Sequence, residues 1–232
     1  MEKVIVLLRD DGRDEQWCRR LRTSVADDIA ALGVAGVTVN VRDDDVRGSL
    51  MTLTTLDPPV VAIVSLWVAQ CYGEQAGAAI DRLGRECRSI AAYLVTESVP
   101  MAPPATQMGN RTTGLANIAL LRRPARLDPG TWLTRWQLDH TPVAIQTQAT
   151  FGYTQNVVVR ALTPNAPAID GIVEELFPAE AVSSLHAFFG AADDDDLRDR
   201  MQKMIASTAR FGANEKIDTI PTSRYVVRTP FA

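Results

Sequence analysis

One order of predicted elements occurs twice along the chain, and it restricts the possible folds more than any other feature of the sequence. Short apolar runs bounded by turn residues predict strands, and apolar stripes at helical spacing predict helices. Residues 1–98 predict strands at 3–9, 37–42, 60–68 and 91–97, with helices after Asp14 and at 74–90. Residues 115–232 predict strands at 115–122, 151–162, 169–177 and 224–229 in the same β-α-β-β-α-β order, with one helix added before the last strand.

This order is that of the ferredoxin-like unit, a four-stranded antiparallel sheet with both helices on one face. The other face of each sheet must also be covered, and two such faces in one chain can cover each other. The sequence therefore predicts an α+β fold in which two tandem ferredoxin-like halves pair their sheets into an α/β barrel. The barrel interior is the expected ligand cavity. A monomer is feasible because the barrel closes within one chain, and a further homodimer is compatible with this fold.

The predicted boundaries follow from composition. The N-terminal half covers residues 1–98 and the C-terminal half covers residues 115–232. Residues 99–114 contain Pro100, Pro103, Pro104 and Gly109, which is typical of a linker.

Bulk properties exclude several classes of partner. The net charge of −4 argues against nucleic-acid binding, and the arginine clusters at 19–22 and 122–126 are expected to be solvated or ion-paired. The three cysteines match no metal or redox spacing, and neither do the adjacent aspartates at 43–45. No run of about 18 apolar residues predicts a membrane span. We therefore expect a soluble cytoplasmic protein without a membrane partner.

The stretch from Asp128 to Pro142 has the strongest features of a site. Asp128 followed by proline predicts a helix start, and Trp132, Trp136 and His140 then lie four residues apart on one helical face. Pro142 cannot donate to the Leu138 carbonyl, so the helix is expected to end or kink beside His140.

His140 has two interpretations. In one, it is a general acid or base acting on a carbonyl or enol substrate, since histidine titrates near neutrality. In the other, it hydrogen-bonds the free Leu138 carbonyl and holds the kink. Trp132 and Trp136 are likewise either core residues or an apolar wall for a ligand. Alignment of Trp17 with Trp132 places His140 opposite Val25, so only the second half is expected to be functional.

Two adjacent glutamates in the strand at 169–177 offer a second acid. Glu174 and Glu175 must face opposite sides of the sheet, and the one that faces the barrel could have a raised pKa. The alternative is a solvated pair at the sheet edge. No metal-ligand set, phosphate loop or dinucleotide motif is present in the sequence, so no metal or cofactor is predicted.

The second half resembles the EthD-like members of the dimeric α/β-barrel superfamily. The resemblance lies in Arg123-Pro124, Trp132, the run Trp136-Gln-Leu-Asp-His140-Thr-Pro142, Tyr153-Thr-Gln155-Asn156 and Asp170-Gly171. Members of this family occur in degradation clusters for organic compounds, and superfamily relatives include polyketide cyclases, dehydratases and monooxygenases. The family is often placed among oxidoreductases, although no redox-cofactor motif occurs here. In the functional interpretation, His140 is the catalytic residue and acts on a small apolar organic ligand. Trp136 and Trp132 would supply an apolar wall for it, Tyr153 or Gln155 a polar contact, and Glu174 is a further candidate for binding it.

Two functions remain open at this point. The first is a cofactor-free enzyme that acts on a small apolar carbonyl, ring or polyketide-like compound in degradation or secondary metabolism, by proton transfer, dehydration or oxidation with dioxygen. The second is a non-catalytic protein that binds such a molecule for a partner oxygenase.

Overall fold

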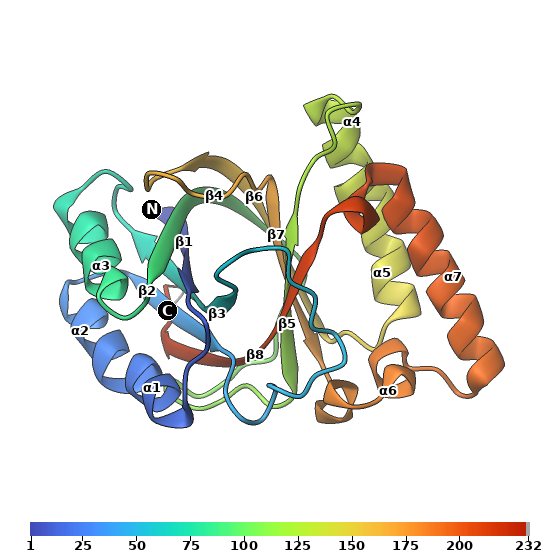
Figure 1. The fold of residues 1–232 in the computed structure, drawn as a ribbon, viewed down its shortest axis with the longest axis horizontal. Helices are drawn as coiled ribbons and strands as arrows, with labels where there is room; N and C mark the ends of the chain where they lie inside the picture. The colour runs from blue at the N-terminus through green and yellow to red at the C-terminus, as the bar shows by residue number, and fades with distance from the viewer. Residues whose placement is uncertain (231–232) are drawn as a thin grey trace.

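The computed structural model describes residues 1–230, and its eight strands close into one barrel (Figure 1). All neighbouring strands are antiparallel, in the order β1-β3-β2-β8-β5-β7-β6-β4. Each half forms one four-stranded sheet, and the pairs β2–β8 and β4–β6 join the two sheets. The predicted α+β barrel of two ferredoxin-like halves is therefore confirmed.

The elements of the first half are β1 (Glu2–Arg9), α1 (Glu15–Arg20), the π-helical η1 (Leu21–Val25), α2 (Ala26–Ala31), β2 (Gly36–Val41), β3 (Val60–Val68), α3 (Glu74–Gly84) and β4 (Ser89–Met101). Those of the second half are β5 (Leu115–Leu121), α4 (Pro129–Leu133), the π-helical η2 (Thr134–His140), α5 (Thr141–Thr147), β6 (Gly152–Ala161), β7 (Gly171–Phe177), η3 (Ala179–Val182), α6 (Leu185–Phe189), α7 (Asp194–Phe211), η4 (Ala213–Glu215) and β8 (Asp218–Arg228). No helix among the described residues is long and apolar enough to cross a membrane.

Several predicted boundaries differ from the structure. Helix α3 ends at Gly84 and not at residue 90, and β4 continues to Met101, into the segment expected as a linker. Strand β8 begins at Asp218, six residues earlier than predicted, and it includes Pro221. Proline is tolerated there because β2 pairs with β8 only from Ser223 onward, so the missing N–H leaves no gap in that ladder.

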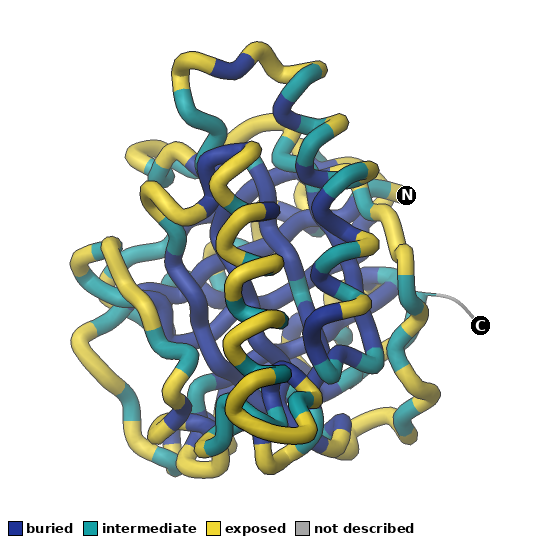
Figure 2. The backbone as a smooth tube through the Cα atoms, turned by 90° about the vertical axis from the view of Figure 1, so that its right-hand side faces the viewer, coloured by how far each residue is buried: buried dark blue, intermediate teal, exposed yellow. Residues whose placement is uncertain are grey.

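Alternate residues of each strand divide the protein into three apolar layers. Inward-facing side chains of both halves, such as Ile5, Ile118 and Ile172, fill the barrel. Outward-facing side chains of β1–β3 pack against α1–α3, and those of β5–β7 pack against α4, η2, α5 and α7. Figure 2 shows the second helix layer from outside, with buried strands behind helices whose outer faces are exposed.

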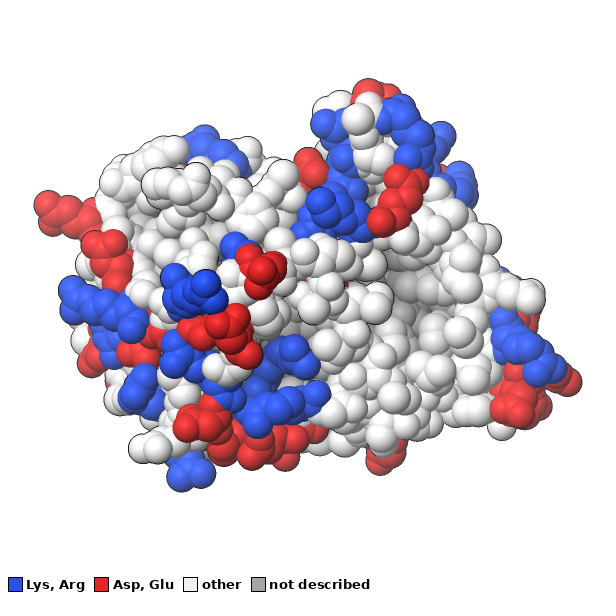
Figure 3. Space-filling view, viewed as in Figure 1, with Lys and Arg blue, Asp and Glu red and all other residues white. Residues whose placement is uncertain are grey.

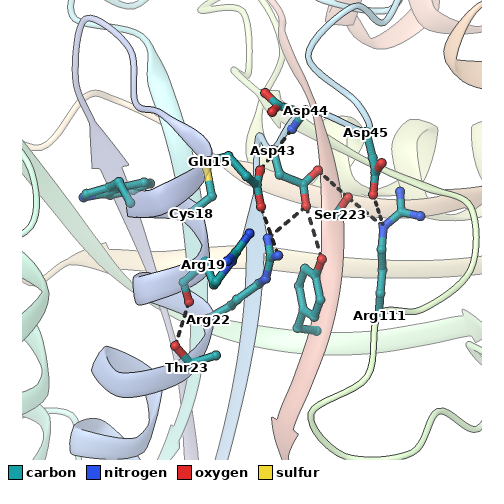
Figure 4. A network of polar contacts seen from close by, with 12 residues as sticks. Glu15, Cys18, Arg19, Arg22, Thr23, Asp43, Asp44, Asp45, Arg111 and Ser223 are labelled. Carbon is teal, nitrogen blue, oxygen red and sulfur yellow. Dashed lines mark hydrogen bonds and ion pairs between the residues drawn. The ribbon is translucent and has the colours of Figure 1, made fainter.

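Buried Asp43 ties the two halves together at the β2–β8 seam (Figure 4). Its carboxylate accepts hydrogen bonds from Ser223 Oγ at 2.7 Å and Tyr225 Oη at 3.2 Å, and it pairs with Arg22 at 3.3 Å. Burial, the largest effect, raises the pKa of Asp43. From this seam, residues 43–59 extend onto the second half, where Leu53 bridges to Thr219.

Candidate functional site

A cavity of about 350 Å³ lies between the sheet of the second half, formed by β5, β6, β7 and β8, and the helices that cover its outer face. Its walls are mainly apolar, and Figure 3 shows a recess of uncharged atoms between the barrel and the helix layer. This volume lies within the range of about 300–1,000 Å³ that is usual for small-molecule sites. The expected ligand cavity was the barrel interior, but Ile118, Leu120 and Ile172 fill the central part of that space. The residues with polar side chains that line the cavity include Asn117, His140, Gln148, Tyr153 and Glu175.

Glu175 places a carboxyl group in this apolar cavity. It lies on β7 directly between Tyr153 of β6 and Asn117 of β5. None of the described residues donates a side-chain hydrogen bond to it or forms an ion pair with it. Loss of hydration on burial raises the pKa of Glu175 to about 8. An acid that titrates this close to neutrality can either accept or release a proton under physiological conditions.

Two amide oxygens in the same cavity also lack a donor. Asn117 Oδ1 and Gln148 Oε1 are both buried and accept no hydrogen bond from the described part of the chain. Buried polar atoms are normally hydrogen-bonded, because an unpaired one costs roughly 1–3 kcal/mol. Asn117 is the cross-strand neighbour of Glu175, and Gln148 lines the same cavity, so a ligand bound there could supply the missing donors.

His140 lines the cavity from the last position of η2. Its Nδ1 lies 2.9 Å from Ser207 Oγ on α7, and its ring packs 4.9 Å from that of Phe211. Burial lowers the pKa of His140 to about 4, so the imidazole is neutral at pH 7. The predicted bond to the Leu138 carbonyl is replaced by the contact with Ser207, and Leu138 itself is exposed on the outer surface.

The π-helical turn explains how the helix continues past Pro142. The Thr141 N–H donates to the Trp136 carbonyl, five residues back, and α5 then runs on to Thr147. Of the two predicted outcomes, an end or a kink beside His140, the end is therefore wrong, because a widened turn accommodates the proline. Such turns are frequent at functional sites.

The two indoles have different surroundings. Trp136 lines the cavity, whereas Trp132 lies in the core behind it, with ring centroids 5.0 Å apart. Gly171 on β7 makes this packing possible, because a Cβ atom there would stand 2.6 Å from Trp136 Cη2. Trp132 thus supports Trp136 without reaching the cavity.

Of the remaining predicted site residues, Tyr153, Gln155 and Glu174, only the first lines the cavity. Tyr153 lines the cavity, and burial raises its pKa far above the ordinary value, so it stays a neutral phenol. Gln155 lies outside the cavity and donates to Thr141 Oγ1 at 2.7 Å, which fixes the π-helical turn. Glu174 faces the barrel interior, where it pairs with Arg224 at 3.0 Å. The raised pKa was expected for whichever glutamate faces the barrel, but it belongs to Glu175, on the helix side of the sheet.

The first half has no equivalent of this polar row. Asn117 is the third residue of β5, Tyr153 the second of β6 and Glu175 the third from the end of β7, and the three are paired across the sheet. The residues at the same positions of β1, β2 and β3 are the buried and mutually paired Val4, Val37 and Leu66. Val25 and His140 likewise both end a π-helical segment. One helix layer therefore has a packed core, and the other has a cavity with polar groups.

Sequence reasoning missed several residues of the cavity. Asn117 and Gln148 carry no motif, although Asn117 interrupts an otherwise apolar strand. Met51 and Leu53 line the second half's cavity but come from the first half, through the segment at 43–59. This segment reaches the cavity of the second half only in the folded barrel.

The structure of this chain is similar to solved structures of α/β-barrel proteins. An anthrone oxidase-like protein is 11% identical, with a TM-score of 0.55, and the match covers 100% of this chain and 95% of that one. A protein of Lactobacillus acidophilus NCFM described as a candidate monooxygenase is 8% identical, with a TM-score of 0.48 and coverage of 98% and 96%. The likeness to the anthrone oxidase-like protein shows that the two chains share the α/β-barrel fold. No protein-family model matches the chain, and no curated protein matches it.

Proposed function

We propose that this chain is a cofactor-free enzyme that moves a proton on a small, mostly apolar carbonyl compound, with Glu175 as the acid–base group. The observation that carries the proposal is the unpaired carboxyl of Glu175, with a pKa of about 8, in a mainly apolar cavity of about 350 Å³. The apolar wall favours a ring system, and the row Tyr153–Glu175–Asn117 places polar groups along one side of it.

The chemistry needs only one proton carrier. Ionised Glu175 takes a proton from a carbon that the substrate carbonyl acidifies, either the carbon next to it or, as in anthrone, the methylene conjugated to it through the aromatic rings. The C–H electron pair then moves toward oxygen to form an enolate. The Asn117 amide then donates to that oxygen. The protonated carboxyl returns its proton to oxygen or carbon, which completes an isomerisation or prepares the enolate for a further step. With a pKa of about 8, roughly a tenth of Glu175 is ionised at pH 7.

Membership of the EthD-like proteins belongs to the same proposal. It is supported by the positions of its motif residues: Trp136 and His140 line the cavity, and Gly171 lies beneath the indoles. His140 is neutral and held by Ser207, so its role here is to orient a ligand through the imidazole rather than to carry the proton.

Exchange of the methylene protons of anthrone in D2O tests the proposal. Anthrone is a suitable probe because it is a tricyclic ketone, and because the anthrone oxidase-like protein has this fold. Under argon, the wild-type protein should accelerate deuterium uptake, and Glu175→Gln should reduce that rate by about a hundredfold or more. Exposed Glu180 provides the matched control, Glu180→Gln, which should exchange like the wild type.

The same experiment separates the enzyme from a binding protein. Anthrone binding is measured by fluorescence titration alongside exchange. Binding without accelerated exchange would support the non-catalytic accessory protein instead. An exchange rate that Glu175→Gln leaves unchanged would refute the role of the carboxyl.

A further inference from the structure

A second cavity, of about 400 Å³, opens at one end of the barrel and differs in chemistry from the first. Every strand except β5 contributes to its lining, and residues 103–108 cover part of it. The inward-facing residues are apolar at the centre of the barrel, as Ile5 and Ile172 show, but polar at this end. The polar layer consists of Lys3, Thr38, Ser65, Glu97, Thr154, Glu174 and Arg224.

Four charged side chains of this layer form two ion pairs. Lys3 of β1 pairs with Glu97 of β4. In the second half, Arg224 Nε of β8 lies 3.0 Å from Glu174 Oε1 of β7. All four are largely buried, with side-chain exposures between 6% and 18%. Ion pairs in such surroundings add little stability compared with an apolar filling, so stability alone does not account for them.

The hydroxyl groups in the layer are available to a ligand. Within residues 1–230, the hydroxyls of Thr38, Ser65 and Thr154 make no side-chain hydrogen bond, although all three residues are buried. They line the cavity together with the ion pairs. The site therefore combines two positive charges, two negative charges and three free hydroxyls in one cavity.

We propose that this end of the barrel binds a small zwitterion with an ammonium and a carboxylate group, of the free amino-acid type. The carboxylate would bind at Arg224 and Lys3, and the ammonium at Glu174 and Glu97. A zwitterion matches the zero net charge of the site, whereas a simple anion or cation would leave one charge unbalanced in a buried setting. The proposal is independent of the proton-transfer function, since Glu174 and Glu175 face opposite sides of β7.

Calorimetric titration with the standard amino acids tests the proposal, with acetate and methylamine as singly charged controls. At least one zwitterion should bind with one-to-one stoichiometry, and neither control should bind. Glu174→Gln should weaken binding about tenfold or more, as expected for loss of one charge-assisted hydrogen bond. Glu180→Gln, the same change at an exposed site, should leave the affinity unaltered.

A second variant distinguishes a loss of binding from a loss of the folded structure. Lys3→Met combined with Glu97→Leu replaces one ion pair by apolar side chains of similar size, which usually preserves stability. This double variant should melt at or above the wild-type temperature. Its affinity for the zwitterion should be lower than that of the wild type by at least about tenfold. Absence of binding across the whole panel, equal binding of acetate or methylamine, or full affinity in the folded double variant would each overturn the proposal.

Discussion

Val25 and His140 occupy the same structural position, the last residue of the π-helical segment in each half. Val25 is completely buried and contributes only apolar packing, whereas His140 borders a cavity and contacts Ser207. This difference coincides with the replacement of Val4, Val37 and Leu66 by Asn117, Tyr153 and Glu175. A polar group on the helix thus accompanies polar groups on the sheet.

The raised pKa of Glu175 predicts a loss of stability at high pH. The folded protein keeps this proton up to about pH 8, whereas the unfolded chain loses it near 4.5, so the free energy of unfolding falls as the pH rises through that interval. The side chain in Glu175→Gln cannot ionise. At about pH 9 the free energy of unfolding of this variant should therefore exceed that of the wild type by roughly 3–5 kcal/mol. Urea denaturation across this pH range measures the difference. Parallel curves for the two proteins would show that Glu175 titrates normally.

The lowered pKa of His140 predicts the opposite dependence on the acid side. Between pH 6.5 and about 4 the unfolded chain binds a proton that the folded protein does not, so the free energy of unfolding falls as the pH is lowered. His140→Asn retains an amide that can bond Ser207 but cannot titrate in this range, and its acid limb should be flatter by on the order of 2–3 kcal/mol. His186→Asn changes the second histidine, which is half-buried and lies outside the cavity, and is the control.

The tryptophans behind the two sheets should matter for stability. Trp17 and Trp132 are 5% and 2% exposed, each in the helix layer of its own half. Replacing either by alanine should cost about 3–5 kcal/mol of unfolding free energy, since a large buried cavity forms. Denaturant midpoints measure the cost. Trp132 does not line the cavity, so correctly folded Trp132→Ala should bind anthrone within a few fold of the wild type.

Introducing residues of the first half at the matching positions of the second half should remove the proposed activity and raise the stability. Asn117→Val with Glu175→Leu reproduces the residues at Val4 and Leu66 and removes a buried acid and an unpaired amide. We expect the free energy of unfolding at pH 7 to rise by about 1–3 kcal/mol. Anthrone exchange should disappear. A double variant less stable than the wild type would indicate that the polar row is satisfied by groups in the protein itself.

The fold could be predicted because its signals are local. Alternating strands and the capping residues Asp14 and Asp128 are visible within a few positions, and both cap the helices as expected. The boundary errors arose where a tertiary contact decides, as at Pro221, which is accepted in β8 only because β2 pairs farther along.

The candidate site was harder to predict because it depends on which side of a sheet is filled. The sequence shows that Glu174 and Glu175 face opposite ways, but not that the barrel side holds an arginine partner and the helix side a void. Likewise, the residues of the polar barrel end come from seven different strands, and no spacing in the sequence brings them together.

Closure of the barrel within one chain has a consequence for how such a protein can change. In a barrel built from two identical subunits, symmetry places every substitution in both halves at once, so a hollow introduced for a ligand weakens the structure twice. Here the seams β2–β8 and β4–β6 join halves encoded separately. One half can therefore retain a dense interior and hold the barrel together, while the other acquires the voids and unpaired groups that chemistry requires.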